Sequence, residues 1–148
     1  DLIRQKLGSN PLDIKIVTGE TYNVMNTCDT LIIASGSATL EAGILGCPMV
    51  IIYKLNPLTY RIALMLIKTP YYGLVNIVAG EGVVPELIQH EANAENIATE
   101  ALKILKNPQH SQKIRERLLL VRENLGSPGV MKDVAKSLAN SLSKIIPS

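Results

Sequence analysis

The chain has 148 residues, of which 47% are hydrophobic and 19% charged, and its formal net charge is +2. This length and composition fit one globular domain with a buried core and exclude a disordered segment. No run of about 18 apolar residues occurs, so no membrane-spanning helix is predicted. Trp and Phe are absent and the tyrosines lie apart from the basic cluster, so we expect no nucleic-acid partner.

The N-terminal third alternates between predicted strands and helices. Strands are expected over 14–17, 30–34 and 49–53, and helices over 1–7, 20–27 and 38–45. The first helix is already in progress at residue 1, so we expect the chain to be a piece of a longer protein. The 30–34 strand lacks polar alternation, which is typical of a parallel strand covered on both faces. The recurring order predicts an α/β fold with a Rossmann-like parallel sheet flanked by helices.

The middle of the chain is less regular. Asn56-Pro57 opens a helix whose apolar centre, 62–67, is either buried or lies against a membrane surface. We interpret 73–78 as a strand or extended loop, and Pro85–Gln89 as a short helix with Pro85 at its first position. Asn76 interrupts an apolar run, so its amide either satisfies backbone groups in a turn or reaches a ligand.

Three amphipathic helices are predicted in the C-terminal part of the chain, over 92–106, 111–125 and 130–146. Asn93 caps the first, and residues 93–148 form a helical tail of one domain that spans 1–148. Eight basic and three acidic residues lie between Lys103 and Lys136. This pattern indicates either a solvated helical face or a surface for phosphates or anionic lipid.

Cysteine and histidine show no spacing typical of metal ligands. Cys28 and Cys47 each lie beside an apolar strand, so we interpret them as small buried residues in a reducing compartment. His90 and His110 fall in polar helix ends and are expected at the surface. We therefore predict no metal site and no cofactor.

The stretch Ser35-Gly36-Ser37 joins a predicted strand to a predicted helix. The first N–H groups of a helix lack internal partners, and the helix dipole adds about half a positive charge there. Small residues let a phosphate approach, and Glu41, one turn beyond Ser37, can reach sugar hydroxyls. The alternative is that a serine only caps the helix. Ligands of parallel sheets bind at the carboxyl ends of strands, which favours the phosphate site.

Three blocks, residues 28–41, 47–54 and 76–89, together resemble the lipid-A-disaccharide synthase family, and the resemblance extends over about 28–125. It implies an inverting glycosyltransferase of the GT-B type, with two Rossmann-like domains. Such an enzyme joins UDP-2,3-diacylglucosamine to 2,3-diacylglucosamine 1-phosphate and releases UDP. The chain would be most of the C-terminal, UDP-sugar-binding domain, and an N-terminal domain would be its partner.

The resemblance also implies roles for individual residues. Asn76 would be catalytic, near the reacting sugar, and the other matching residues would bind substrate: the diphosphate by Ser35, Gly36 and Ser37, the ribose by Glu41, and the donor by Gln89. Roles for Lys54 and Glu86 stay open, and Glu86 is also placed to cap its own predicted helix. The implied location is cytoplasmic, peripheral to the inner membrane of a Gram-negative bacterium, with membrane contact and a homodimer both allowed.

Two residues depart from the family pattern: Val75 stands where the family has Pro, and Glu81 where it has a basic residue. The family's glycine-rich phosphate loop and its acidic candidate base are missing from the sequence. We therefore expect this chain alone to bind UDP weakly and to turn nothing over. Two alternatives stay open: a UDP-sugar epimerase of the same architecture, and a non-catalytic nucleotide-sugar-binding module.

Overall fold

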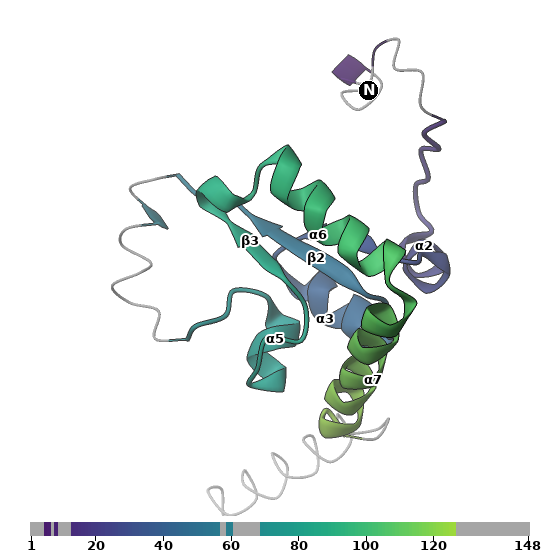
Figure 1. Ribbon diagram of the computed structural model, residues 1–148, viewed down its shortest axis with the longest axis vertical. Coiled ribbons are helices and arrows are strands. Elements are labelled where there is room, and N and C mark those ends of the chain that lie inside the picture. Colours follow the sequence, from purple (N-terminus) through teal and green to yellow (C-terminus); the bar gives the residue numbers. More distant parts are fainter. Residues whose placement is uncertain (1–4, 7, 9–12, 57–58, 61–68, 127–148) are drawn as a thin grey trace, which may run out of the picture.

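A three-stranded parallel sheet lies at the centre of the structure, a computed structural model that describes residues 5–6, 8, 13–56, 59–60 and 69–126 (Figure 1). The strands lie in the order β1 (Leu31–Ala34), β2 (Met49–Tyr53) and β3 (Glu86–Ile88). Leu31 pairs with Met49, and Ile51 pairs with Glu86. Met49 to Ile51 are fully buried because β2 is the central strand. The predicted parallel α/β fold is confirmed.

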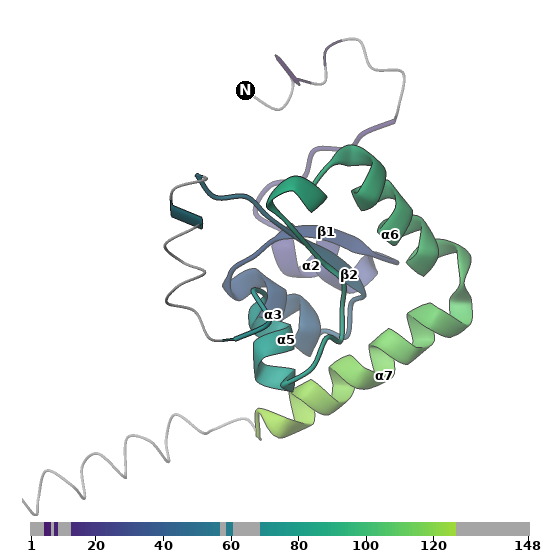
Figure 2. The ribbon, with the colours of Figure 1, turned by 60° about the vertical axis from the view of Figure 1, so that its left-hand side comes forward.

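Helices cover the two faces of this sheet (Figures 1 and 2). Helix α6 (Ala94–Lys106) packs on one face, against β1 and β2. Helix α3 (Ser37–Ile44) lies on the other, and α5 (Leu74–Ala79) and α7 (Pro108–Asn124) pack against it. Helix α2 (Thr21–Thr27) adjoins α3, and the short 3₁₀ helix η1 (Gln89–Glu91) follows β3.

The helices predicted as a tail contribute to the hydrophobic core. Ile114, Leu118 and Val121 of α7 and Ile104 of α6 are all buried in the cluster that contains β2. Helices α3 and α5 approach closely at Gly43, where an added Cβ would lie 2.7 Å from Val75 Cγ2. Helices α6 and α7, predicted as amphipathic helices of the same domain, therefore bury their apolar faces in its core.

Two expectations for the first strands are wrong. Residues 14–17 form no strand, and most of this segment is exposed. Ile32 in β1 is 54% exposed, so β1 is not covered on both faces. Apolar composition alone does not bury a strand, because burial needs a neighbouring element, and within the described residues β1 lies at the sheet edge.

The structure reverses the assignments of 73–78 and Pro85–Gln89. Residues Leu74–Ala79 form helix α5, which ends at Gly80, where φ is +70°. Glu86–Ile88 form strand β3, and the carbonyl of Pro85 accepts a hydrogen bond from Ile51 N–H at 2.9 Å. Proline cannot donate to a ladder, so it precedes the strand at the sheet edge.

Helix ends in the C-terminal part follow the capping residues. Asn93 caps α6 as predicted, since its side chain accepts the Asn96 N–H. Helix α7 begins before the predicted residue 111, because Asn107 caps it and Pro108 occupies its first turn. The predicted helices over 1–7, 56–67 and 130–146 fall wholly or largely outside the described residues.

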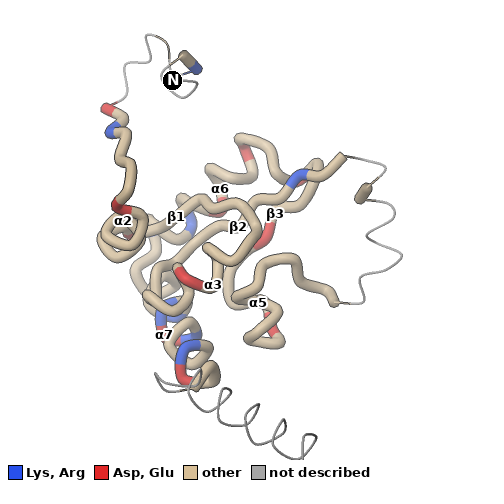
Figure 3. The backbone as a smooth tube through the Cα atoms, turned by 180° about the vertical axis from the view of Figure 1, so that it is seen from behind, with Lys and Arg blue, Asp and Glu red and all other residues tan. Residues whose placement is uncertain are grey.

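The charges of the described helices are mixed. Figure 3 shows Lys and Arg on α7 with acidic residues among them, and Lys113 and Arg122 are exposed beside the exposed Glu116 and Glu123. Both histidines are exposed, as predicted. Cys47 is buried, and its burial raises the pKa of the thiol to about 11, whereas Cys28 is half-buried.

Candidate functional site

The turn Ser35–Ser37, which we call the serine turn, joins the carboxyl end of β1 to the first residue of α3. Ser35 N–H continues the sheet pairing by donating to the Ile52 carbonyl at 3.0 Å. Gly36 occupies the N-cap position, and no side chain caps α3, so the interpretation of a serine as N-cap is wrong. A Cβ added at Gly36 would meet nothing within 4 Å. The N-terminus of α3 is therefore open to a ligand.

The two serines of this turn differ in their hydrogen bonds. Ser35 Oγ is half-buried and donates to the Tyr72 carbonyl at 2.7 Å. Ser37 is exposed, and its hydroxyl has no partner within the described residues. The Ser37 hydroxyl is thus available to a ligand, whereas Ser35 ties the turn to the segment before α5.

Glu41 lies one turn after Ser37 on α3, and it is half-buried. The phenol of Tyr22, on the neighbouring helix α2, lies close to Glu41. A hydrogen bond to Glu41 and the negative charge of Glu41 together raise the pKa of Tyr22. Tyr22 was missed in the sequence because it falls in a short helix without a distinctive motif. Helix α2 therefore brings a phenol next to the carboxylate that was predicted to bind sugar hydroxyls.

Asn76 is 1% exposed, and protein groups occupy its whole side-chain amide. Its Nδ2 donates to the Val84 carbonyl at 2.9 Å and to Glu86 Oε1 at 2.7 Å. Its Oδ1 accepts from Val83 N–H at 2.9 Å and Val84 N–H at 3.1 Å. An amide has two N–H donors and two acceptor lone pairs, so all are used. Of the two alternatives for Asn76, the structure shows the one in which it satisfies backbone groups.

The Glu86 carboxylate sits at the start of α5. Oε2 accepts from Tyr72 N–H at 2.8 Å, and Oε1 accepts from Gly73 N–H at 3.0 Å as well as from Asn76. The expectation that Glu86 caps its own helix is wrong, because it begins a strand and serves α5 instead. A Cβ at Gly73 would lie 2.3 Å from Ile51 Cδ1, so a larger residue here would force the Ile51 side chain to move. We call this set of contacts the α5–β3 junction.

Gln89 fastens together the segments that follow β2 and β3. Its Oε1 accepts from Leu55 N–H at 2.9 Å, and its Nε2 donates to the Leu55 carbonyl at 3.2 Å. The backbone of Gln89 has φ of +54°, a left-handed conformation that costs a non-glycine residue about 1 kcal/mol or more. The sequence did not indicate this backbone contact, and the contact of Gln89 with a donor stays a prediction.

A cavity of about 380 Å³ lies between Tyr60, the start of α5 and β3. We call it the tyrosine cavity. Its polar lining comes from tyrosines and acidic or amide groups, among them Tyr60, Tyr72, Asn76, Glu86 and Glu91. The hydrogen bond between the Tyr72 phenol and Tyr60, together with desolvation, favours the protonated form and raises the pKa of Tyr72. Because the Tyr72 carbonyl also accepts the Ser35 hydroxyl, this cavity adjoins the serine turn.

Glu81, where the family pattern has a basic residue, pairs with Arg117 of α7. The Arg117 Nε–H donates to Glu81 Oε1 at 3.1 Å, and Nη2 lies 2.8 Å from Oε2. This pairing lowers the pKa of Glu81. A cation therefore stands next to this loop, supplied by another helix.

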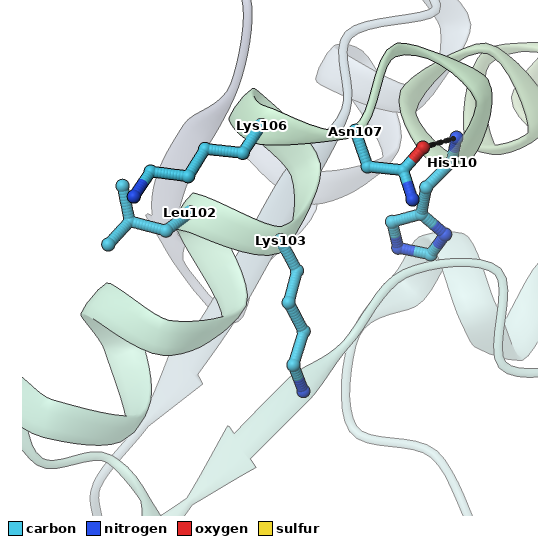
Figure 4. A pocket seen from close by; sticks show the side chains of 5 residues that line it. All are labelled: Leu102, Lys103, Lys106, Asn107 and His110. Atoms are coloured by element: carbon cyan, nitrogen blue, oxygen red, sulfur yellow. Dashed lines mark hydrogen bonds between the residues drawn. The ribbon is translucent and has the colours of Figure 1, made fainter.

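A second cavity, of about 460 Å³, lies at the elbow between α6 and α7 (Figure 4). Lys103, Lys106 and His110 line it, and the Asn107 cap of α7 is seen beside His110. The middle of α7 lies near the segment that precedes β2, since Arg115 donates to the Gly46 carbonyl at 3.1 Å. The elbow contains none of the predicted site residues.

Comparison with known proteins shows similarity to lipid-A-disaccharide synthases. The family model described as lipid-A-disaccharide synthetase matches residues 2–139. A lipid-A-disaccharide synthase of Geobacter sulfurreducens is 44% identical over 138 residues, which are 93% of this chain and 36% of that enzyme. One of Geobacter metallireducens is 45% identical over 142 residues, 96% of this chain and 37% of that enzyme.

A more distant example is the lipid-A-disaccharide synthase of Nitrosococcus oceani, 41% identical over 125 residues, 84% of this chain and 32% of that enzyme. The chain thus spans about a third of the length of the curated relatives it matches. None of the helices in the described residues combines the length and hydropathy that crossing a bilayer requires.

Proposed function

The chain belongs to the lipid-A-disaccharide synthetase family, and we propose that it supplies the part of a glycosyltransferase that binds the UDP-linked donor. The whole enzyme transfers 2,3-diacylglucosamine from UDP to 2,3-diacylglucosamine 1-phosphate. An N-terminal domain supplies the acceptor site and the catalytic base. The reaction takes place at the cytoplasmic face of the inner membrane.

The observation that carries the proposal is the open N-terminus of α3 at the carboxyl end of β1. Unpaired N–H groups and the helix dipole favour a diphosphate there. Gly36 leaves room for it, and the Ser37 hydroxyl is available to donate a hydrogen bond. Glu41, one turn further along α3, accepts hydrogen bonds from the ribose hydroxyls.

The proposed contacts of the diphosphate with α3 also explain how the donor half of the site assists an inverting transfer. The acceptor hydroxyl loses its proton to a base, and its oxygen bonds to the anomeric carbon as the bond to UDP breaks on the opposite face. Negative charge then collects on the departing diphosphate. N–H groups of α3 and the Ser37 hydroxyl stabilise that charge, which lowers the barrier.

The remaining predicted residues support this turn by holding backbone in place. Ser35 fixes the turn through the Tyr72 carbonyl, and Gln89 fixes the exit of β2 through Leu55. Asn76, predicted as catalytic, acts on the reaction by holding α5 and the 83–84 segment in position. Its four protein hydrogen bonds support this positioning role.

Titration calorimetry of the chain with UDP, UMP and ADP tests donor binding. We expect UDP to bind more tightly than the other two, and Glu41→Ala to weaken UDP binding by about tenfold, which is the loss of one or two hydrogen bonds to a charged group. Glu95→Ala, an exposed acidic residue of α6, is the matched control and should leave binding unchanged. Equal affinity for UDP and ADP, or an unaffected Glu41→Ala variant, would contradict the proposal.

Assay of the full-length enzyme with UDP-2,3-diacylglucosamine and 2,3-diacylglucosamine 1-phosphate tests the reaction itself. Disaccharide and UDP should form in equal amounts, and the 148-residue chain alone should form neither. Product formed by the chain alone would show that the base lies within these residues. UDP-N-acetylglucosamine converted to an epimer would instead support the epimerase alternative.

A further inference from the structure

We propose that the tyrosine cavity receives the sugar ring of the donor and that Glu91, which lines it, favours an uncharged ring over one that carries an acidic group. The inference rests on the proposed function and adds a second compartment to it. The diphosphate lies at the serine turn, and the sugar lies beyond Tyr72. Nothing in the sequence motifs singled out Glu91.

The lining of the cavity suits a sugar and not a phosphate. Two carboxylates, Glu86 and Glu91, face it, and neither Lys nor Arg is among its described lining residues. Carboxylates only accept hydrogen bonds, which matches sugar hydroxyls and repels phosphate or carboxylate groups. The phenols of Tyr60 and Tyr72 add donors and apolar ring faces. Its volume of about 380 Å³ also falls in the range of small-molecule sites, about 300–1,000 Å³.

The two carboxylates differ in whether their oxygens already accept hydrogen bonds from the protein. Glu86 already accepts hydrogen bonds from Tyr72, Gly73 and Asn76, so it is committed to the α5–β3 junction. Glu91 is exposed, and its carboxylate has no hydrogen-bonding partner within the part of the chain that the structure describes. The acceptor oxygens available to a sugar hydroxyl are therefore those of Glu91.

The backbone next to Glu91 is held by the two hydrogen bonds between the Gln89 side chain and the Leu55 backbone. Gln89, with its positive φ, starts η1, which contains Glu91 and contacts β3. The side-chain amide of Gln89 holds that turn against Leu55. A left-handed residue fastened in this way fixes the backbone next to Glu91, whose side chain lines the cavity.

Tyr72 connects the two compartments. Its carbonyl accepts the Ser35 hydroxyl at 2.7 Å, its N–H donates to Glu86 at 2.8 Å, and its side chain lines the cavity. A diphosphate held at the serine turn therefore has the cavity as its neighbour. We therefore expect a sugar attached to that diphosphate to enter the cavity that Glu91 lines.

The test compares three soluble probes, UDP, UDP-N-acetylglucosamine and UDP-glucuronic acid, by titration calorimetry on the chain and its variants. We expect UDP-N-acetylglucosamine to bind more tightly than UDP, and UDP-glucuronic acid more weakly than UDP-N-acetylglucosamine, because its sugar carboxylate meets Glu91. Glu91→Gln should leave UDP affinity unchanged. It should weaken the binding of UDP-N-acetylglucosamine about fivefold, because the variant loses one charge-assisted hydrogen bond to the sugar. It should also reduce the ratio of the affinities for UDP-N-acetylglucosamine and UDP-glucuronic acid, because the repulsion between Glu91 and the sugar carboxylate is lost. Glu95→Gln, with the same change of charge on the exposed side of α6, should alter neither ratio.

The outcomes separate this inference from the proposed function. UDP binding with equal affinity for the two UDP-sugars, or an unchanged ratio in Glu91→Gln, overturns the sugar compartment and leaves the donor site standing. No binding of UDP overturns both. A shift of the ratio in Glu91→Gln but not in Glu95→Gln supports the compartment and assigns the selectivity to Glu91.

Discussion

The serine turn and the α5–β3 junction are neighbours that use their polar groups in opposite ways. At the turn, Gly36 faces open space, Ser37 has an available hydroxyl, and no side chain caps α3. At the junction, Asn76 and Glu86 have protein partners on all of their side-chain polar atoms. Ser35 belongs to both, since its hydroxyl crosses from the turn to Tyr72.

This difference separates residues that can bind a ligand from residues that stabilise the fold. Buried polar groups must be hydrogen-bonded, so residues at the junction stabilise the fold and cannot also hold a ligand without losing those bonds. At the turn, Ser37 and the open side of Gly36 stabilise little and remain available, whereas the Ser35 hydroxyl is bonded. Substitutions at the junction should therefore lower the free energy of unfolding, and substitutions at the turn should lower affinity for UDP.

Asn76→Ala should have the largest effect. It leaves the Val83 and Val84 N–H groups, the Val84 carbonyl and a Glu86 oxygen without their partner, and we expect a loss of about 3 kcal/mol or more in the free energy of unfolding. Chemical denaturation measures this loss. Asn26→Ala, at an exposed position of α2, is the control and should stay within about 0.5 kcal/mol. A stable Asn76→Ala variant that has lost only affinity would reverse the assignment.

Two glycine substitutions provide the next test. Gly73→Ala places a Cβ 2.3 Å from Ile51 Cδ1, and overpacking of this kind costs about 1–3 kcal/mol. Gly36→Ala meets no atom within 4 Å and should keep its stability while it weakens UDP binding, because the methyl group occupies the space for the diphosphate. Unfolding curves and UDP titrations of both variants give the comparison directly. If the two variants showed the same change in stability and the same change in UDP affinity, the turn and the junction would not differ in role.

The serines should show the same contrast on a smaller scale. Ser35→Ala removes the half-buried bond to the Tyr72 carbonyl, and we expect a loss of about 1 kcal/mol in stability. Ser37→Ala removes a hydroxyl without a described partner, so the melting temperature should stay the same and UDP affinity should fall. If Ser37→Ala binds UDP like the parent, the diphosphate is held by backbone N–H groups alone.

The Glu81–Arg117 pair should have the smallest effect, since both groups reach solvent. The pairing lowers the pKa of Glu81 in the folded chain, so its contribution is present above the unfolded pKa, about 4.5, and is lost as pH falls through the folded value. The unfolding midpoints of the parent and Glu81→Gln should therefore differ slightly at pH 7 and converge as the pH falls through the folded pKa of Glu81. High salt should reduce the difference at pH 7. A difference that grows at acid pH would show that the pair is not its source.

The parts of the fold that were predicted correctly depend on local patterns. Apolar runs at 30–34 and 49–53 with a helix between them indicate a parallel pair, and the Asn93 cap marks where α6 begins. Three sequence blocks sufficed to indicate the family. Such signals lie within a few residues of one another, so they are readable without the tertiary structure.

The region 73–88 was assigned wrongly because its stability comes from elsewhere in the chain. Its apolar runs are too short to show a helical or strand period. Helix α5 starts where Glu86, thirteen residues after Gly73, accepts a backbone N–H, and β3 forms where Ile51 supplies a ladder partner. Neither contact is visible as a local pattern.

The sequence by itself determined a parallel α/β domain, a small polar turn at the end of a strand, and the family. Only the tertiary structure decided which polar residues remain available to a ligand. Ser35 and Ser37 look alike in the sequence, yet the hydroxyl of one is bonded to Tyr72, 37 residues away, and the other is exposed. Hydrogen bonds across such separations form only when packing brings the segments together, because a buried polar group takes whichever partner the fold places beside it.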